Sequence, residues 1–286
     1  MGLLEGDAGS DLAMAKSIDS AMSMDWALSG KAYPVLRFHR REDVPSPPAP
    51  HDSQWEPDGS AQPEPAFAPA IYRASVDSLG TRVDLRLFMP GRFDWVVRAG
   101  DKEKTHRLGG EFKKSLEEAE RSRAFVAIGL GIGKRRGPLG LRVSGSTGHG
   151  FHHQGALIVA EPSGLVVRVS KAPDPEGDAT EAPLTAEGGA LLPASRERGP
   201  LQARADLCVL EDGTVLYAQA EFDSHEPTAT VLSELGCSAV AALDRGTDEA
   251  AWSEMRDHLA PAHEATALFA LARPTFGSVR ADASHR

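Results

Sequence analysis

Asp244 is the residue of this sequence whose setting most clearly suggests chemistry. It ends the apolar run "SAVAALD", which predicts a buried strand over residues 238–244, and a turn with the sequence "RGTDEA" follows. A carboxylate delivered at a strand end beside a flexible turn is a common place for a catalytic or binding residue. The alternative is a capping role in this turn or at the helix expected near Glu249. The local pattern alone favours capping.

The second candidate is the glycine-rich stretch "AFVAIGLGIGKRRGPLGLRV" at residues 124–143. A phosphate-binding P-loop needs a glycine five residues before the Gly-Lys pair and a hydroxyl residue after it. Ile128 and Arg135 occupy these two positions. The dinucleotide fingerprint also fails, because Pro138 follows where a helix would have to begin. The stretch therefore predicts a strand that leads into a glycine-rich connection.

Three histidines, His149, His152 and His153, lie close together in "GHGFHHQG". Two histidines three residues apart share a metal ion when they stand on a helix, but the flanking glycines favour an exposed loop. We therefore expect no metal site. The Gly-x-Ser-x-Gly motif of serine hydrolases is absent from the sequence. We expect no cofactor either.

The elements around these residues are predicted mainly as strands. In "TRVDLRLFMP", Val83, Leu85 and Leu87 alternate with charged residues, which is typical of a half-buried strand. Two hairpins follow, one turning near Ser163 and one at Asp212-Gly213, a dipeptide that favours tight turns. By alternation, the second hairpin should turn one set of side chains inward, drawn from Leu207, Val209, Val215 and Tyr217.

Helical spacing predicts an amphipathic helix over 111–123, a short helix over 227–236 that ends at Gly236, and helical structure over 249–260. Residues 173–200 are rich in proline, glycine and acidic residues and are predicted to form a long exposed loop. The predicted fold class is α+β, with a mostly antiparallel twisted sheet and a few flanking helices.

The chain divides into four predicted parts. Residues 1–43 form an N-terminal arm with a short helix, and 44–70 form a proline-rich linker without regular structure. Residues 71–277 form the main domain, and 278–286 form a C-terminal tail.

Bulk composition excludes some partners. The chain has 286 residues and a formal charge of −10, which argues against nucleic acid as the main partner. No apolar stretch reaches the length of about 18 residues needed to span a membrane. The N-terminus lacks the pattern of a signal peptide, and the compartment stays open.

The two cysteines, Cys208 and Cys237, lie in apolar settings without metal-ligand spacing. Free buried thiols are favoured over a disulfide.

Three segments, "VAIGLGIGKRRGPLGLRVSG", "ARADLCVLEDGTVLYAQAE" and "LGCSAVAALDRGTDE", occur in this order along the chain. They resemble motifs of the phosphodiester glycosidase family, which includes bacterial exopolysaccharide-biosynthesis proteins. The family's "LGC", strand and "LDGGGSS" correspond to "LGCSAVAALDRGTDE", and its "AINGGFF" followed by "GLxVxxG" corresponds to "VAIGLGIGKRRGPLGLRVSG". Between them the family has a hairpin with "R-x-x-x-G-x-x-x-D-G", which corresponds to "ARADLCVLEDGTVLYAQAE". The resemblance covers most of the chain after the linker, and it departs from the family at Gly129, where the family has asparagine, and at Arg245, where it has glycine.

The resemblance implies a site for a sugar phosphate or a polysaccharide. It assigns Asp244 as the catalytic acid/base or orienting carboxylate. It assigns substrate binding to Arg204, Gly129, Gly131, Arg245 and Gly246. The departures imply weakened or lost hydrolysis of sugar-1-phosphodiesters; an active glycosidase and a purely binding or structural module are the alternatives.

Overall fold

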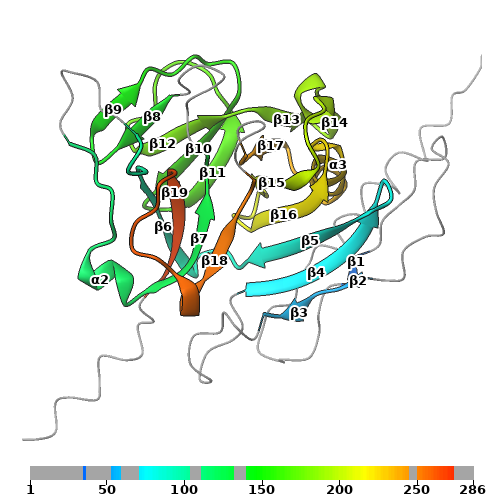
Figure 1. Cartoon of the computed structure of the whole chain (residues 1–286), viewed down its shortest axis with the longest axis horizontal. Coiled ribbons are helices and arrows are strands. Elements are labelled where there is room, and N and C mark those ends of the chain that lie inside the picture. The colour runs from blue at the N-terminus through cyan, green and yellow to red at the C-terminus, as the bar shows by residue number, and fades with distance from the viewer. Residues whose placement is uncertain are drawn as a thin grey trace, which may run out of the picture.

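The structure is a computed structural model, and it describes residues 35–36, 53–58, 71–103, 111–131, 140–244 and 250–273. The described chain is dominated by antiparallel sheets and is mainly β (Figure 1). It therefore agrees with the predicted α+β class only loosely. None of the helices in these ranges has the length and apolar character needed to cross a membrane.

An eight-stranded sheet carries the elements nearest to Asp244. Its strand order is β14-β13-β17-β15-β16-β5-β4-β3. The strands are β3 (Glu56–Pro57), β4 (Ile71–Ser78), β5 (Thr81–Phe88), β13 (Leu184–Glu187), β14 (Ala190–Leu191), β15 (Gln202–Val209), β16 (Val215–Phe222) and β17 (Ala239–Ala242). The predicted hairpin at Asp212-Gly213 is confirmed, because β15 and β16 pair along their whole length.

Two further sheets complete the main body. The five-stranded sheet contains β8 (Leu141–Val143), β9 (Ser146–His149), β10 (Ala156–Glu161), β11 (Gly164–Val169) and β12 (Asp178–Ala182). The four-stranded sheet contains β6 (Phe93–Arg98), β7 (Ala124–Gly129), β18 (Ser253–Met255) and β19 (Ala267–Ala272). A short pair is formed by β1 (Val35–Leu36) and β2 (Ser53–Gln54).

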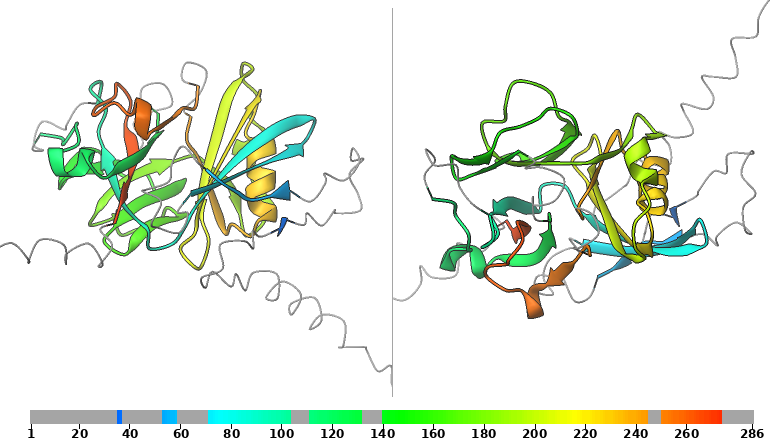
Figure 2. Two further views of the ribbon diagram at one scale, coloured as in Figure 1. Left: turned by 90° about the horizontal axis from the view of Figure 1, so that it is seen from below. Right: turned by 45° about the horizontal axis from the view of Figure 1, so that its top comes forward.

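The largest hydrophobic cluster draws its side chains from all three of these larger sheets. It includes Ile128 of β7, Ile158 of β10, and Leu207 and Tyr217 of the central hairpin. Figure 2 shows the sheets arranged around this interior, with α3 (Glu226–Glu234) on the far side of the eight-stranded sheet. A second cluster packs α3 against that sheet and includes Val83, Leu85 and Leu87, as the alternation in β5 predicts.

The predicted helices fare differently. The helix over 227–236 is confirmed as α3, whereas the helix over 111–123 shrinks to α2 (Glu118–Arg121). Phe112 and Leu116 are buried, but in different clusters. The Leu116 N–H donates to the Pro261 carbonyl. Phe112 and Leu116 are thus spaced as on a helix, but they lie on an extended segment and pack at two separate places.

Two other predictions are wrong. The helix expected over 249–260 is replaced by β18, which pairs with β7, and by the 3₁₀ helix η3 (Arg256–His258). The exposed loop expected over 173–200 contains β12, β13, β14 and the 3₁₀ helix η2 (Pro193–Arg196). The small side chains of Ala182 and Ala186 pack in the core, so a segment rich in turn residues still forms strands.

The predicted linker also contributes to the sheet. The whole of 44–70 is predicted to lack regular structure, which is wrong at β3. This strand pairs with β4, and Trp55 beside it is buried in the cluster under α3. The helix expected in residues 1–43 lies outside the described residues. The division into four parts therefore stays a prediction, with the outer boundary of the sheet at β3 rather than at residue 71.

Cys208 and Cys237 form a disulfide, so the preference for free thiols is wrong. Cys208 lies on β15 and Cys237 just beyond α3, and both belong to the cluster between helix and sheet. Helix packing therefore brings together two cysteines whose sequence contexts suggested only burial.

Candidate functional site

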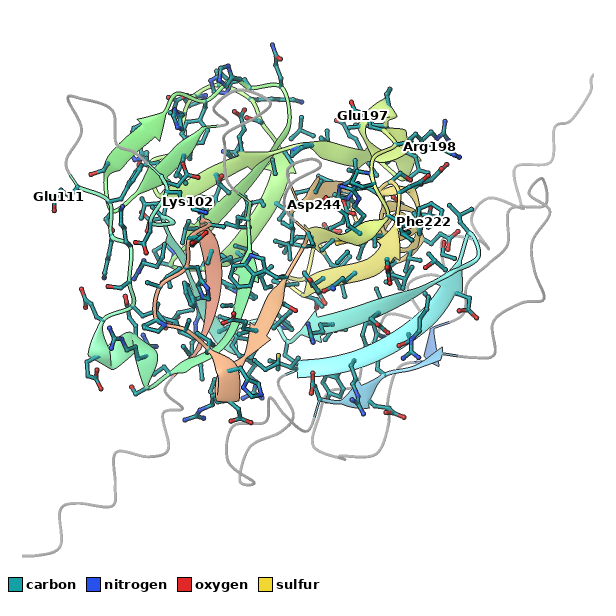
Figure 3. The ribbon with its side chains drawn as sticks, in the orientation of Figure 1. Lys102, Glu111, Glu197, Arg198, Phe222 and Asp244 are labelled. Atoms are coloured by element: carbon teal, nitrogen blue, oxygen red, sulfur yellow. A yellow bond between two sulfur atoms is a disulfide. The ribbon has the colours of Figure 1, made fainter. Side chains whose placement is uncertain are left out.

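Asp244 lies at the end of β17 with its side chain completely buried. Its Oδ2 atom accepts a hydrogen bond from Arg204 Nη1 at 2.5 Å. Its Oδ1 atom lies 3.0 Å from Nε2 of His225. Figure 3 shows Asp244 labelled near the middle of the view. The two resemblance-derived residues Arg204 and Asp244 are therefore in direct contact.

Strand pairing explains how these side chains meet. In β15, Arg204 and Asp206 are two residues apart and share one face of the strand. β15 pairs with β17, where Asp206 is opposite Ala242, so the chain that leaves β17 passes beside Arg204. The Leu243 N–H donates to the Ala205 carbonyl at 2.9 Å, which holds Asp244 in place.

His225 reaches the site from the start of α3. Its Nδ1 atom lies 2.9 Å from Asp206 Oδ2, so the ring bridges the two aspartates. Two threonine hydroxyls also donate to Asp206: Thr185 at 2.7 Å and Thr228 at 2.5 Å. Asp206 itself is fully buried. We call the group of Arg204, Asp206, His225 and Asp244 the central ion cluster.

The charges of the central ion cluster balance. Burial opposes the charged imidazole, but the charges and hydrogen bonds of Asp206 and Asp244 outweigh it and raise the pKa of His225 to about 10. Burial alone would raise the pKa of Asp244, yet His225 and Arg204 lower it overall. Two cations therefore face two carboxylates at neutral pH.

The Arg204 side chain also binds the protein backbone. Its Nη2 atom donates to the Pro200 carbonyl at 3.1 Å. A side chain at Gly199 would meet the same nitrogen at 2.6 Å, so the glycine makes room for the guanidinium. Within the described residues, the buried Nε atom of Arg204 has no hydrogen-bond partner.

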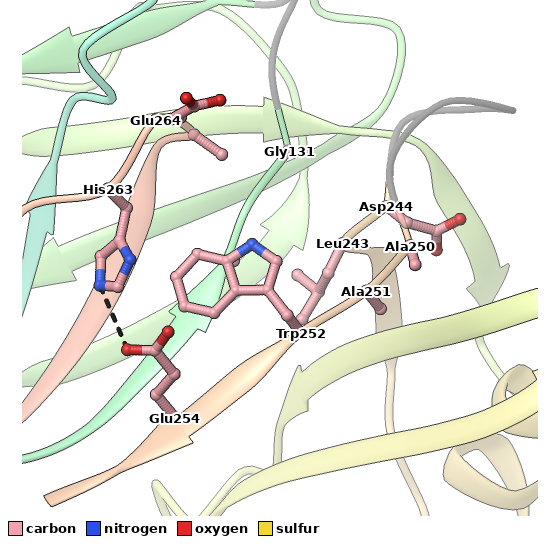
Figure 4. A pocket seen from close by; sticks show the side chains of 11 residues that line it. Gly131, Leu243, Asp244, Ala250, Ala251, Trp252, Glu254, His263 and Glu264 are labelled. Carbon is pink, nitrogen blue, oxygen red and sulfur yellow. Dashed lines mark ion pairs between the residues drawn. The ribbon is translucent and has the colours of Figure 1, made fainter. Parts of the chain in front are cut away.

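A cavity of about 330 Å³ lies beside Asp244 (Figure 4). Gly129 and Gly131 line it, as do Trp252 and Glu254 from the β18 segment and His263 before β19. In the close-up, the Trp252 ring lies between the Glu254–His263 pair on one side and Asp244 on the other. The structure thus places both predicted glycines and Asp244 around one hollow.

Gly129 has a specific steric role in this wall. A Cβ atom at this position would lie 2.4 Å from Nε1 of Trp252. The indole therefore occupies the space beside the position where the resembled family has asparagine. Gly131 has a φ of 73°, a conformation that glycine adopts without strain.

Other predicted residues lie elsewhere or are not described. Arg245 and Gly246 fall outside the described residues. His149 belongs to β9, the backbone N–H groups of His152 and His153 donate to Glu181, and His153 Nε2 lies 3.0 Å from Asp174. Over the ranges that the structure describes, no three His, Cys, Asp or Glu side chains gather as a metal site would require.

Five residues in or beside the site are not identified from the sequence: Asp206, His225, Trp252, Glu254 and His263. A signal existed for Asp206, because period two in β15 puts it on the face of Arg204. No signal in the sequence joined His225 to Asp244, since the contact depends on how α3 crosses the sheet. Glu254 was obscured by the incorrect helix over 249–260.

No family model and no curated protein matches this chain. Among solved structures, a hypothetical protein from Synechocystis aligns with a TM-score of 0.46 and 11% identity over 71% of this chain and 62% of that protein. The chain thus spans less than two thirds of the length of the Synechocystis protein. A second solved structure is the catalytic domain of zebrafish N-acetylglucosamine-1-phosphodiester alpha-N-acetylglucosaminidase, auto-inhibited by its pro-peptide. It aligns with a TM-score of 0.48 and 12% identity, and the alignment covers 71% of this chain and 82% of that domain. Both similarities are weak.

Proposed function

We propose that the chain is a diverged phosphodiester glycosidase-like domain in which hydrolysis of sugar-1-phosphodiesters is weakened or lost. The observation that carries the proposal is the engagement of both Asp244 carboxylate oxygens by Arg204 and His225. The motif resemblance supplies the substrate class, a sugar phosphate.

The protonation state of Asp244 does not suit acid/base catalysis. A catalytic acid or base works best with a pKa near the operating pH. Arg204 and His225 instead lower the pKa of Asp244, so it stays ionised and holds protons weakly. Its side chain is also 0% exposed, so a substrate would have to displace a group that already contacts the carboxylate, such as Arg204 or His225.

The charge environment disfavours a phosphodiester as well. Arg204 would be the residue to hold the anion, but it already pairs with Asp244 and Pro200. The neighbouring cavity carries Glu254, whose negative charge repels a negative ligand. Preorganised donors around the leaving phosphate are the main source of catalysis in such reactions, and losing one costs about 10²–10³ in rate.

An active glycosidase is the second candidate, and the cavity beside Asp244 favours it. A substrate in that cavity would lie next to Asp244 and to the Glu254–His263 pair. A binding module without turnover is the third candidate. Its ligand would be a sugar phosphate or a polysaccharide.

The test is a chromogenic sugar-1-phosphodiester assayed with the wild type, Asp244→Asn and Asp77→Asn. Asp77 is exposed on β4 and serves as the matched control. We expect no turnover above background from any of the three proteins. Clear turnover that is lost in folded Asp244→Asn and retained in Asp77→Asn would establish the active enzyme instead.

A thermal-shift measurement separates a binding module from a purely structural domain. A rise in the melting temperature with a sugar phosphate, without turnover, supports the binding module. If the sugar phosphate causes no rise in the melting temperature and there is no turnover, a structural role is supported.

A further inference from the structure

We propose that the cavity beside β18 binds the ammonium group of a small organic cation, held by Glu254 and His263 next to the Trp252 ring. This proposal goes beyond the proposed function, because it involves neither phosphate nor chemistry at Asp244.

The first observation is that two hydrogen-bond acceptors, Glu254 Oε2 and His263 Nε2, face each other with no donor of the described residues between them. Glu254 Oε2 and His263 Nε2 are 3.8 Å apart, which is too long for a direct hydrogen bond. The His263 side chain is only 10% exposed, and its Nε2 atom has no hydrogen-bond partner among the described residues. A buried polar atom left unpaired is costly, so a ligand that supplies a donor at this point would be stabilised.

The protonation of His263 leaves that nitrogen as an acceptor. Burial lowers the pKa of His263, against the opposing effects of the Glu254 charge and of a hydrogen bond with the Ala260 backbone. The ring is therefore neutral at pH 7. Since Nε2 is the ring nitrogen without a partner, we assign the proton to Nδ1, which leaves a lone pair at Nε2.

The charges around the cavity favour a cation. Asp244 is balanced within the central ion cluster, and Glu264 pairs with Lys102. Glu254 accepts a hydrogen bond from the Ala260 N–H at 3.2 Å, and no lysine or arginine of the described chain pairs with it. Glu254 therefore contributes a carboxylate whose charge a ligand can match.

The aromatic ring adds to the same preference. The Trp252 indole lines the cavity, with its ring centroid 4.5 Å from that of His263 and the two rings tilted by 38°. An aromatic ring attracts a nearby cation. An ammonium group carries three N–H donors and can serve both acceptors, whereas one hydroxyl hydrogen serves only one of them. A cavity of about 330 Å³ has room for a small amine.

Isothermal titration calorimetry with three probes of one shape tests the proposal. The probes are cyclohexylammonium, cyclohexanol and cyclohexanecarboxylate, titrated into the full chain at low salt. We expect the ammonium to bind about 10- to 100-fold more tightly than the alcohol, because a charge-assisted hydrogen bond is the stronger one. The carboxylate should not bind.

Variants locate the binding in this cavity. Glu254→Gln and His263→Gln should each weaken ammonium binding by about tenfold or more, while His258→Gln, an exposed residue of η3, should leave it unchanged. Having two cavity variants keeps the test valid if one of them does not fold. Equal affinity for ammonium and alcohol, unchanged binding in the folded cavity variants, or no binding of the ammonium would overturn the proposal.

Discussion

At the scale of single residues, His225 decides the state of the central ion cluster. The ring is buried between two carboxylates, Asp206 and Asp244, and both contacts require ring protons. Besides His225, Arg204 is the one positively charged side chain of the described residues that contacts either aspartate, and it contacts Asp244. Loss of the imidazolium charge would therefore leave Asp206 with neutral donors only among the described residues.

The first prediction concerns the pH dependence of stability. The folded-state pKa of His225 is raised from 6.5 to about 10, so its contribution is fully present below pH 6.5 and is lost as the pH rises through about 10. His225→Gln should lower the free energy of unfolding by about 3–5 kcal/mol at pH 6, as expected when one partner of a buried ion pair is removed. Urea unfolding at pH 6, 8 and 10 measures the difference.

The gap between wild type and His225→Gln should shrink toward pH 10. Comparing the two proteins at each pH cancels the titration of lysines and tyrosines elsewhere. A gap that stays constant from pH 6 to pH 10 would mean that the ring is uncharged in the folded protein.

At the scale of elements, the β15–β16 hairpin supports both the core and the site. Leu207 is opposite Tyr217, and Val209 is opposite Val215, so the four residues from which the inward set was predicted form two cross-strand pairs on one face. Leu207, Val215 and Tyr217 are buried, and Val209 packs against the same cluster. The same strand carries Arg204 and Asp206, so distortion of the hairpin would also move the ion cluster.

The second prediction tests this face of the hairpin. Leu207→Ala should cost about 2–4 kcal/mol, through lost burial and a cavity. Leu201→Ala is the control, because Leu201 is 67% exposed. Thermal or urea unfolding of both variants gives the comparison, and similar melting temperatures for the two would contradict the assignment of the core.

The sequence allowed strands and hairpins to be predicted where alternation is regular, as in β5 and the β15–β16 hairpin. It failed where spacing is ambiguous. Phe112 and Leu116 have helical spacing but anchor an extended segment, and the helical pattern near Trp252 belongs to β18. Of the site, Asp244 was singled out by its place at a strand end, and Arg204 was identified through the resemblance. His225 was not, because its contact with Asp244 depends on tertiary packing that no local pattern encodes.

At the scale of the whole molecule, the sheet extends beyond the domain boundary predicted from composition. Trp55 is 2% exposed and packs in the cluster between α3 and the eight-stranded sheet. The Asp58 N–H donates to the Ile71 carbonyl at 2.9 Å. The segment before residue 71 thus contributes a large aromatic side chain to the core.

The third prediction is that Trp55→Ala destabilises the full chain by about 3–5 kcal/mol, in the range for a buried aromatic residue. Glu56→Ala provides the control, since Glu56 is the exposed neighbour. If both variants unfold at the same denaturant concentration, the main domain begins after this segment, as composition alone suggested.

The disulfide between Cys208 and Cys237 also has a mechanical consequence. The bond spans a sequence separation of 29 residues, and this loop contains β16, α3 and His225. When the chain is pulled from its two ends, tension passes through the covalent bond, and the loop cannot be extended. In an optical trap, adding a reductant should therefore lengthen the fully stretched chain by about 100 Å, the span of roughly 29 extended residues.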